Sequence, residues 1–258
     1  MIKFYEGDCL KVMPKEIKDE SIDVIITSPV YNIGAKYHKY NDKLPWEKYY
    51  SFITKASLEF YRSLKMDGSL FLNVGFTPRS PWTAMKIAEI FGKTFYLQNQ
   101  IIWVKSVVIN GKTHGHYQPL NSPRFLNNNW EFVFHFTKEG KRKLDALALS
   151  VPYIDETNKK RWASSIGKAP EGNVWFIKHE SRNQKNEAKH PAVFPVLLPE
   201  KCIKLHGITN NMVVLDPFMG TGATMLACRN LSNENTTING VGIELDKKYV
   251  EIAIGRCN

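Results

Sequence analysis

The sequence predicts an α/β protein with one mostly parallel sheet. Its 258 residues, 43% of them hydrophobic, are enough to build one substantial core. Short β-branched apolar runs alternate along the chain with segments whose apolar residues recur at helical spacing. Because strands that alternate with helices pair in parallel, we expect a parallel sheet with helices on both faces.

The first half of the chain carries the strongest strand signal. Ile22–Thr27 is β-branched and nearly all apolar, and it runs into Ser28-Pro29, which predicts a buried strand ending in a functional turn. From Trp46 to Leu64 aromatic and apolar residues recur at helical spacing, and Asp67-Gly68 follows as a stop signal. Further strands are expected at Ser69–Val74, Gln100–Lys105 and Glu131–Thr137, with a helix at Trp82–Phe91.

The second half continues the alternation. Val174–Lys178 has the pattern of a short strand, and Pro199–His206 that of a helix. A strand at Met212–Leu215 should end at Asp216, and a helix is expected at Ala223–Leu231. The segment Gly242–Asp246 has the pattern of a strand that ends in an acid.

The charge of the chain favours a polyanionic partner. Lys and Arg number 35 against 25 acidic residues, a formal charge of +10, although a merely soluble basic surface explains this equally well. Residues 138–189 hold twelve Lys or Arg and seven acids, a net +5. We interpret them as an inserted region whose cations, Lys159, Lys160 and Arg161 among them, contact DNA phosphates, with Trp162, Trp175 and Phe176 available for stacking. A solvated loop is the alternative.

The same composition argues against several other classes of protein. No apolar run approaches the roughly 20 residues of a membrane span, and the first residues lack the apolar stretch of a signal peptide, so we expect a cytoplasmic protein. The four cysteines are scattered without a Cys-x-x-Cys pair, so neither a zinc site nor a disulfide framework is expected. No metal site is predicted.

A glycine loop marks the first candidate site. The run 216–224 reads Asp-Pro-Phe-Met-Gly-Thr-Gly-Ala-Thr and stands between a predicted strand and a predicted helix. Gly220 and Gly222 would let the backbone approach a ligand, and the helix that follows would present free N–H groups. Glu244, at the end of a later strand, could accept from ribose hydroxyls. Met225 replaces the third glycine of the dinucleotide fingerprint, which favours a mononucleoside cofactor. An ordinary glycine turn is the alternative.

A second candidate site follows the first strong strand. Pro29 restrains Ser28 to extended geometry, which fixes the direction of the Ser28 carbonyl. That carbonyl could accept a hydrogen bond from the amino group of a base, and the ring of Tyr31 could stack on the base. Taken alone, a strand followed by Ser-Pro is more often a plain turn.

Together these motifs resemble the amino-methyltransferases of bacterial and archaeal restriction–modification systems in their permuted β arrangement. That family carries a Ser-Pro-Pro-Tyr or Asp-Pro-Pro-Tyr loop near the N-terminus and an Asp-Pro-Phe-x-Gly-x-Gly-Thr loop near the C-terminus, in the order seen here. Gly7-Asp8 and the segment 190–195 (His-Pro-Ala-Val-Phe-Pro) also resemble family segments. Val30 departs from the pattern by replacing the second proline, which frees a backbone N–H.

The resemblance implies a fold and a division of the chain. It implies a Rossmann-like, class I S-adenosylmethionine-dependent methyltransferase fold with an inserted target-recognition region. Residues 1–137 would form the catalytic half, 138–189 the basic insertion, and 190–258 the cofactor-binding half of the same domain. The resemblance implies catalytic roles for Ser28, Pro29 and Tyr31, and S-adenosylmethionine contacts for Asp8, Asp216, Phe218, Gly220, Gly222, Thr224 and Glu244.

The implied reaction is methylation of an exocyclic amine in double-stranded DNA after the base has been flipped out of the helix. Serine at position 28 favours N4 of cytosine in this family, and N6 of adenine is the runner-up. A non-catalytic nucleic-acid-binding protein with the same fold is the rival from another class, and methylation of RNA or of a protein glutamine is the rival reaction. The recognition sequence, the presence of a cognate endonuclease and a homodimeric state stay open.

Overall fold

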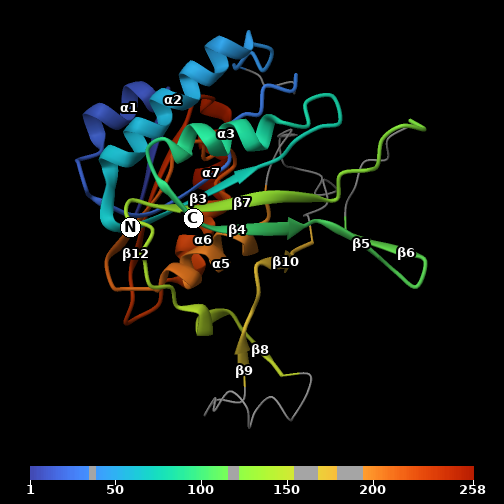
Figure 1. The fold of residues 1–258 in the computed structure, drawn as a ribbon. Coiled ribbons are helices and arrows are strands. Elements are labelled where there is room, and N and C mark those ends of the chain that lie inside the picture. The colour runs from blue at the N-terminus through green and yellow to red at the C-terminus, as the bar shows by residue number, and fades with distance from the viewer. Residues whose placement is uncertain (35–38, 116–121, 154–167, 179–193) are drawn as a thin grey trace.

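The computed structural model describes residues 1–34, 39–115, 122–153, 168–178 and 194–258 (Figure 1). Within these ranges the main sheet has eight strands in the order β1-β12-β11-β2-β3-β7-β4-β10. Two small two-stranded sheets, β5-β6 and β8-β9, accompany it. The bounds of the main strands are β1 Ile2–Glu6, β2 Ile22–Thr27, β3 Leu64–Val74, β4 Tyr96–Val104, β7 Trp130–Thr137, β10 Val174–Phe176, β11 Met212–Asp216 and β12 Ile238–Glu244.

The sheet is mostly parallel, as the alternation of strands and helices predicts. Strand β7 is the exception, because it runs antiparallel to both of its neighbours, β3 and β4. Strands β1, β12, β11, β2 and β3 pair in parallel, and so do β4 and β10. The carboxyl ends of the five parallel strands therefore meet at one edge of the sheet, which is where ligands bind in open α/β folds.

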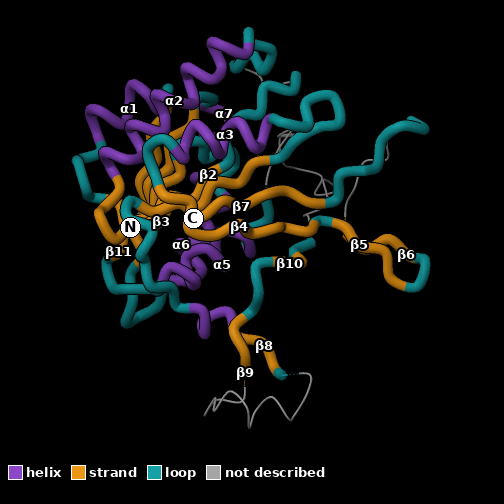
Figure 2. Tube along the Cα trace, viewed as in Figure 1, coloured by secondary structure: helices purple, strands orange, loops and turns teal. Residues whose placement is uncertain are grey.

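Helices cover both faces of the sheet (Figure 2). One face carries α1, α2 and α3, whose buried side chains form one apolar cluster with the sheet. The other face carries α5, α6 and α7. Their bounds are α1 Cys9–Glu16, α2 Trp46–Ser63, α3 Thr83–Gly92, α5 Leu197–His206, α6 Ala223–Leu231 and α7 Lys247–Cys257, with the short 3-10 helix η1 at Ala146–Leu149. No described helix is both long and apolar enough to cross a membrane.

Side chains of β3 show how a single strand serves both layers. Leu70, Leu72 and Val74 belong to the cluster under α1–α3, whereas Phe71 belongs to the cluster under α5 and α6. This alternation is the period-2 pattern of a strand buried on both faces. It explains why the strand reads as a continuous apolar run in the sequence.

Several elements differ from expectation. Strand β3 begins at Leu64, directly after α2, and Asp67-Gly68 lies inside it, at an irregularity in its pairing with β2. No strand or helix is predicted from the sequence at the positions of β1, α1 and α7. Strand β1 lies at the edge of the sheet and alternates weakly, and Pro14 interrupts the helical signal of α1.

Part of the basic segment, residues 138–189, belongs to the main sheet. Strand β10, within residues 138–189, pairs in parallel with β4 at the edge of the main sheet. Trp175 on this strand is 1% exposed and lies beneath the ammonium group of Lys201, 4.8 Å from its ring centre. The expectation that Trp175 is available for stacking on DNA is therefore wrong, because a strand that completes the sheet turns it into the core. Phe176 is exposed, and Trp162 lies outside the described residues.

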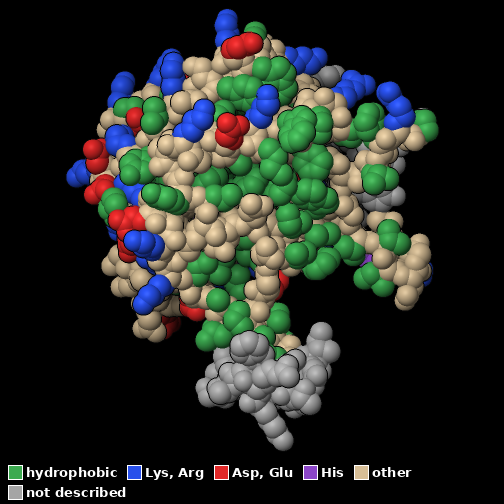
Figure 3. All heavy atoms as spheres, viewed as in Figure 1, with side chains coloured by type: hydrophobic (Ala, Val, Ile, Leu, Met, Phe, Trp, Pro, Cys, Tyr) green, Lys and Arg blue, Asp and Glu red, His purple; other side chains and the backbone are tan. Residues whose placement is uncertain are grey.

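Two small sheets and one surface feature complete the fold. The hairpin of β5 (Ser106–Ile109) and β6 (Lys112–Gly115) extends beyond the carboxyl end of β4, and β8 (Ser150–Pro152) pairs with β9 (Lys168–Pro170) at the bottom of the view (Figure 1). Lys and Arg side chains gather over α1–α3 in the upper part of the space-filling view (Figure 3).

Candidate active site

The predicted site residues follow four parallel strands and come together at the carboxyl edge of the sheet. Asp8 follows β1, Ser28 follows β2, Asp216 ends β11 and Glu244 ends β12. These strands are neighbours in the order β1-β12-β11-β2. Residues separated by up to 236 positions in the chain thus lie along one edge.

The glycine loop between β11 and α6 has the backbone geometry that glycine permits. Gly220 and Gly222 have φ values of 54° and 84°, in the left-handed region that other residues avoid. A Cβ atom on Gly222 would lie 2.7 Å from the Cβ of Ala253 in α7. Both glycines are therefore required by the conformation and, at Gly222, by the close approach of α7.

Glu244 supports this loop from the neighbouring strand. Its Oε2 accepts a hydrogen bond of 2.9 Å from the Gly220 amide, and its Oε1 accepts one of 2.9 Å from the Asp246 amide. Burial raises the pKa of Glu244, and the backbone donors oppose that shift. The carboxylate is held beside the loop with lone pairs left for a further donor.

Asp216 joins the glycine loop to the loop that carries Ser28. Its carboxylate is fully buried and accepts from the hydroxyls of Thr27 at 2.8 Å and Thr224 at 2.7 Å, and from the Phe218 amide at 3.1 Å. Burial raises the pKa of Asp216 to about 6, although the hydroxyl donors lower it. Since Asp216 and Thr224 are both buried and bind each other, their side chains shape the loop from within.

The carboxylate of Asp8 makes a hydrogen bond that stabilises a helix. Asp8 is the N-cap of α1, where its Oδ1 accepts a hydrogen bond of 3.0 Å from the Leu10 amide. Asp8 therefore stabilises the start of α1. One capping bond leaves most of the acceptor capacity of a carboxylate unused.

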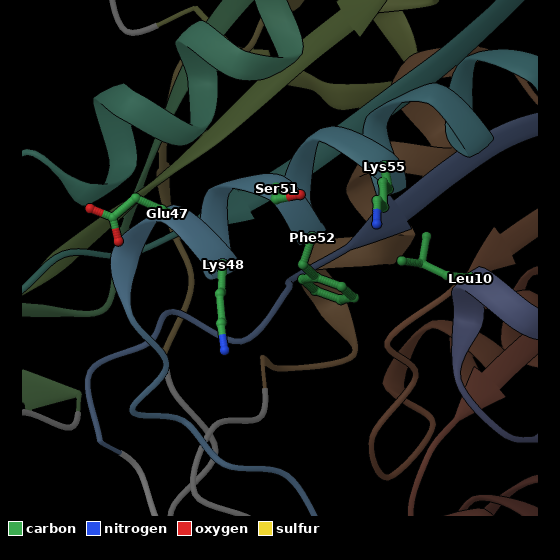
Figure 4. Close-up of a pocket in the computed structure, with 6 residues that line it drawn as sticks. All are labelled: Leu10, Glu47, Lys48, Ser51, Phe52 and Lys55. Carbon is green, nitrogen blue, oxygen red and sulfur yellow. The ribbon is translucent and has the colours of Figure 1, made fainter.

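A hollow of about 430 Å³ adjoins these residues between α1 and α2 (Figure 4). Leu10, which follows the Asp8 cap, lines it together with Glu47, Lys48, Ser51, Phe52 and Lys55. The ring of Phe52 also meets that of Phe218 edge-on, with centroids 5.9 Å apart. Its lining thus includes Leu10, two residues after Asp8, and Phe52, which contacts Phe218. These two apolar walls suit a flat aromatic group.

The loop after β2 is held by side chains from α2 and from residues 41–44. The Tyr49 hydroxyl donates to the Val30 carbonyl at 2.6 Å. The amide of Asn32, which has a φ of 57°, donates to Asp42, and the Asn32 side chain exchanges hydrogen bonds with the backbone of Leu44. The position where family members have a second proline is therefore held by a hydrogen bond from Tyr49.

Polar groups behind Ser28 were missed by sequence reasoning. The Ser28 hydroxyl lies 2.7 Å from the Tyr31 hydroxyl, which in turn lies 3.4 Å from Oε2 of Glu131 and 3.4 Å from Oδ1 of Asn73. Asn73 is the one polar residue among the apolar residues at the end of β3, and Glu131 stands near the start of another apolar strand, β7. A polar residue in such a position is a signal that could have pointed to them.

The thiols are unsuited to covalent catalysis. Burial raises the pKa of Cys9 to about 12 and also raises the pKa of Cys202 and Cys228. A thiol becomes a nucleophile only as the thiolate.

Some predicted residues cannot be placed. Lys159, Lys160 and Arg161 lie outside the described residues, and so does His190. Their proposed contacts with DNA, and the resemblance around His190, stay predictions from sequence.

The fold and this site define a class of protein, the S-adenosylmethionine-dependent methyltransferases with a Rossmann-like sheet. The model of a DNA methylase family matches residues 22–255. The type II methyltransferase M.HpaI of Haemophilus parainfluenzae is 31% identical over 242 residues, covering 93% of this chain and 69% of the relative. DNA adenine methyltransferase YhdJ of Escherichia coli is 25% identical over 260 residues, covering 97% and 80%.

Solved structures share the fold. PvuII DNA methyltransferase, described as cytosine-N4-specific, has a TM-score of 0.71 at 19% identity and covers 99% of this chain and 86% of its own. The complex of M1.HpyAVI with S-adenosylmethionine has a TM-score of 0.61 at 24% identity, with coverage of 99% and 100%. The chain belongs to the DNA methylase family that modifies amino groups at N6 or N4, and S-adenosylmethionine is its cofactor.

Proposed function

We propose that this chain methylates N4 of cytosine at a specific site in double-stranded DNA. The observation that carries the proposal is the hydrogen bond between Thr27 and Asp216, because it joins the Ser28 loop directly to the glycine loop. In the proposal the Ser28 loop holds the amine of the base and the glycine loop holds the methyl donor, and this hydrogen bond supports the proposal because it joins the two loops.

Ser28 is the proposed contact for the amine. S-adenosylmethionine supplies the methyl group from its positively charged sulfonium. The amino nitrogen of a base shares its lone pair with the ring, so acceptors for its hydrogens increase its nucleophilicity as the new bond forms. The carbonyl and hydroxyl of Ser28 are those acceptors in the proposal, and the ring of Tyr31 stacks on the flipped base.

The cofactor residues are proposed from the same geometry. Glu244, held beside Gly220, accepts from ribose hydroxyls. In the proposal the adenine lies at the hollow lined by Leu10 and Phe52, near Phe218, which contacts Phe52, and Asp8 accepts from its amino group. The left-handed turns at Gly220 and Gly222 support this assignment, because they let the backbone approach the ligand closely.

The choice of base rests on Ser28. A serine hydroxyl can accept from an amine and donate to a ring nitrogen, whereas an ionised aspartate can only accept. Both cytosine and adenine offer an amine beside a ring nitrogen, so N6 of adenine is the second candidate, and the likeness to YhdJ favours keeping it. DNA contact by residues 138–189, a homodimer and a cognate endonuclease are further parts of the proposal.

Mass analysis of nucleosides tests the proposed base. Unmethylated genomic DNA is incubated with the protein and S-adenosylmethionine and digested to nucleosides. We expect N4-methylcytosine as the product. N6-methyladenine as the sole product would contradict the base assignment and leave amino methylation intact. A protein that binds DNA but neither binds S-adenosylmethionine in calorimetry nor methylates DNA would favour the non-catalytic rival.

A further inference from the structure

A chain of hydrogen-bonding groups leads from Ser28 into the protein. The Ser28 and Tyr31 hydroxyls are 2.7 Å apart, and the Tyr31 hydroxyl is 3.4 Å from Oε2 of Glu131. The same Oε2 accepts from the Asn73 side-chain amide at 3.1 Å, while Oε1 accepts from Lys105 at 2.7 Å. The Glu131 side chain is 17% exposed, so it is partly shielded from water at the end of this chain.

Either hydroxyl could donate in the contact between Ser28 and Tyr31. Tyr31 has one hydroxyl proton, and the described contacts offer it four acceptors: Ser28 Oγ, Oε2 of Glu131, and the side-chain and backbone oxygens of Asn73. The charged carboxylate is the strongest of these acceptors. When Tyr31 donates to Glu131, the short contact with Ser28 requires that Ser28 donate to Tyr31. The remaining lone pair of Ser28 Oγ is then left to accept from another group.

We propose that Glu131 is a positioning residue that acts through Tyr31 to present Ser28 Oγ to the substrate amine as a hydrogen-bond acceptor. This inference rests on the proposed role of Ser28. Glu131 does not touch the base. It fixes the direction of the two hydroxyl protons, so that the oxygen facing the amine accepts rather than donates.

Tight packing keeps the members of this chain in place. A Cβ atom on Gly75 would lie 2.9 Å from the Tyr31 ring and 3.1 Å from Oε1 of Glu131. The backbone of residue 75 thus lies against both side chains. Their hydroxyl and carboxylate groups have little room to move apart.

The substitution Glu131→Gln reverses the direction of the hydrogen bonds that run from Ser28 through Tyr31 to residue 131, and it keeps the shape of the side chain. Lys105 can only donate, so it holds the oxygen of the new amide and turns the NH₂ group toward Tyr31. Tyr31 then accepts from residue 131 and donates to Ser28, whose own proton points toward the amine, and the Asn73 side-chain amide loses Oε2 as its acceptor. Lys105→Met in the same background removes that constraint, and the amide oxygen can turn back toward Tyr31 and Asn73.

The test uses purified full-length variants, unmethylated genomic DNA and S-adenosylmethionine with a tritiated methyl group, under single-turnover conditions. We expect Glu131→Gln to lower the methylation rate roughly tenfold to a hundredfold. S-adenosylmethionine affinity measured by calorimetry should stay within about twofold, and Lys105→Met should restore part of the rate. Glu89→Gln, on the exposed face of α3, controls for the loss of one charge.

A double-mutant cycle separates positioning from a general structural effect. In a Tyr31→Phe background, Glu131→Gln should add less than about a twofold loss, because the connection to Ser28 is already gone. The inference is overturned by any of three results: a wild-type rate for Glu131→Gln, additive rate losses in the double-mutant cycle, or no rescue by Lys105→Met. An inactive wild-type protein with either base contradicts the proposed function instead. If Glu131→Gln does not fold, Glu131→Asp, which keeps the charge, should retain more activity than Tyr31→Phe.

Discussion

Two buried polar networks lie at opposite ends of the sheet and differ in what they connect. The network at the carboxyl edge centres on Asp216, which accepts from two hydroxyls and an amide of the site loops. The network at the amino end centres on Ser69, whose hydroxyl lies 3.1 Å from Nε2 of His135 and 2.9 Å from Nδ1 of His206. The first joins loops that carry the proposed chemistry, and the second joins a strand pair to the end of α5.

Burial disfavours charge in both networks, with opposite consequences for protons. It raises the pKa of Asp216 to about 6 and lowers the pKa of His135 to about 3 and of His206 to about 4. The charge of Arg142 also lowers the pKa of both histidines. Changes at the carboxyl edge should therefore alter activity, whereas changes at the amino end should alter stability and its dependence on pH.

The largest expected effect is the loss of cofactor binding in Gly220→Val. The φ of 54° is strained for a branched residue, and the side chain would enter the close-approach position of the loop. Calorimetry with S-adenosylmethionine should detect no binding by a folded variant. Gly92→Val is the matched control, because Gly92 has open space around its Cβ position. Near-normal affinity in Gly220→Val would exclude this loop as the cofactor site.

The second prediction concerns acid stability and the amino-end network. The folded pKa values of His135 and His206 lie below the unfolded value of 6.5, so the unfolded state binds more protons as pH falls. Stability is lost as pH falls from about 6.5 toward 4 for His206 and 3 for His135, by about 1.4 kcal/mol per pH unit for each histidine at most. Asp216 acts in the opposite direction. Because burial raises its folded pKa to about 6, it adds stability as pH falls from about 6 to 4.

His206→Gln isolates one of these contributions. The amide can still bind Ser69 and Arg142 but cannot take up a proton. Urea unfolding between pH 4 and 6.5 should show a pH slope smaller than wild type by close to one proton. The methylation rate at neutral pH should stay unchanged. An unaltered slope would show that His206 is protonated equally in the folded and unfolded states.

The two networks also differ in how visible they are in the sequence. The carboxyl edge could be predicted because glycine, proline and serine in its loops interrupt apolar strands at recognisable places, as in Ser28-Pro29 and Gly220-x-Gly222. The amino-end histidines stand inside patterns that otherwise indicate a strand or a helix. Their role depends on contacts across the sheet, such as the one between His135 and Ser69, which are 66 positions apart.

Long-range contacts within the site are equally hard to predict. The motif predicts Asp216 as a cofactor contact, and this stays a prediction, but its burial and its bonds to Thr27 and Thr224 depend on how β2 and β11 pair. The sequence predicts Glu131 only as part of a strand, and its polar side chain at the start of an apolar strand does not reveal its partners. Long-range pairing, which periodicity does not encode, decides both roles.

The smallest predicted effect comes from removing one hydroxyl from each network and comparing the results. Thr27→Val keeps the shape of the side chain and removes the donor to Asp216, so the link between the two site loops is lost while the Phe218 amide still donates. We expect the methylation rate to fall about tenfold, consistent with loss of a hydrogen bond to a charged group. Thr27→Ser should recover most of the rate.

Thr137→Val is the matched control, because it removes a buried hydroxyl that donates to Gln98 at the amino end. It should lower the free energy of unfolding by about 1 kcal/mol and leave the rate intact. Equal rate losses in both variants would mean that the two ends of the sheet are coupled, contrary to the separation drawn from their contacts.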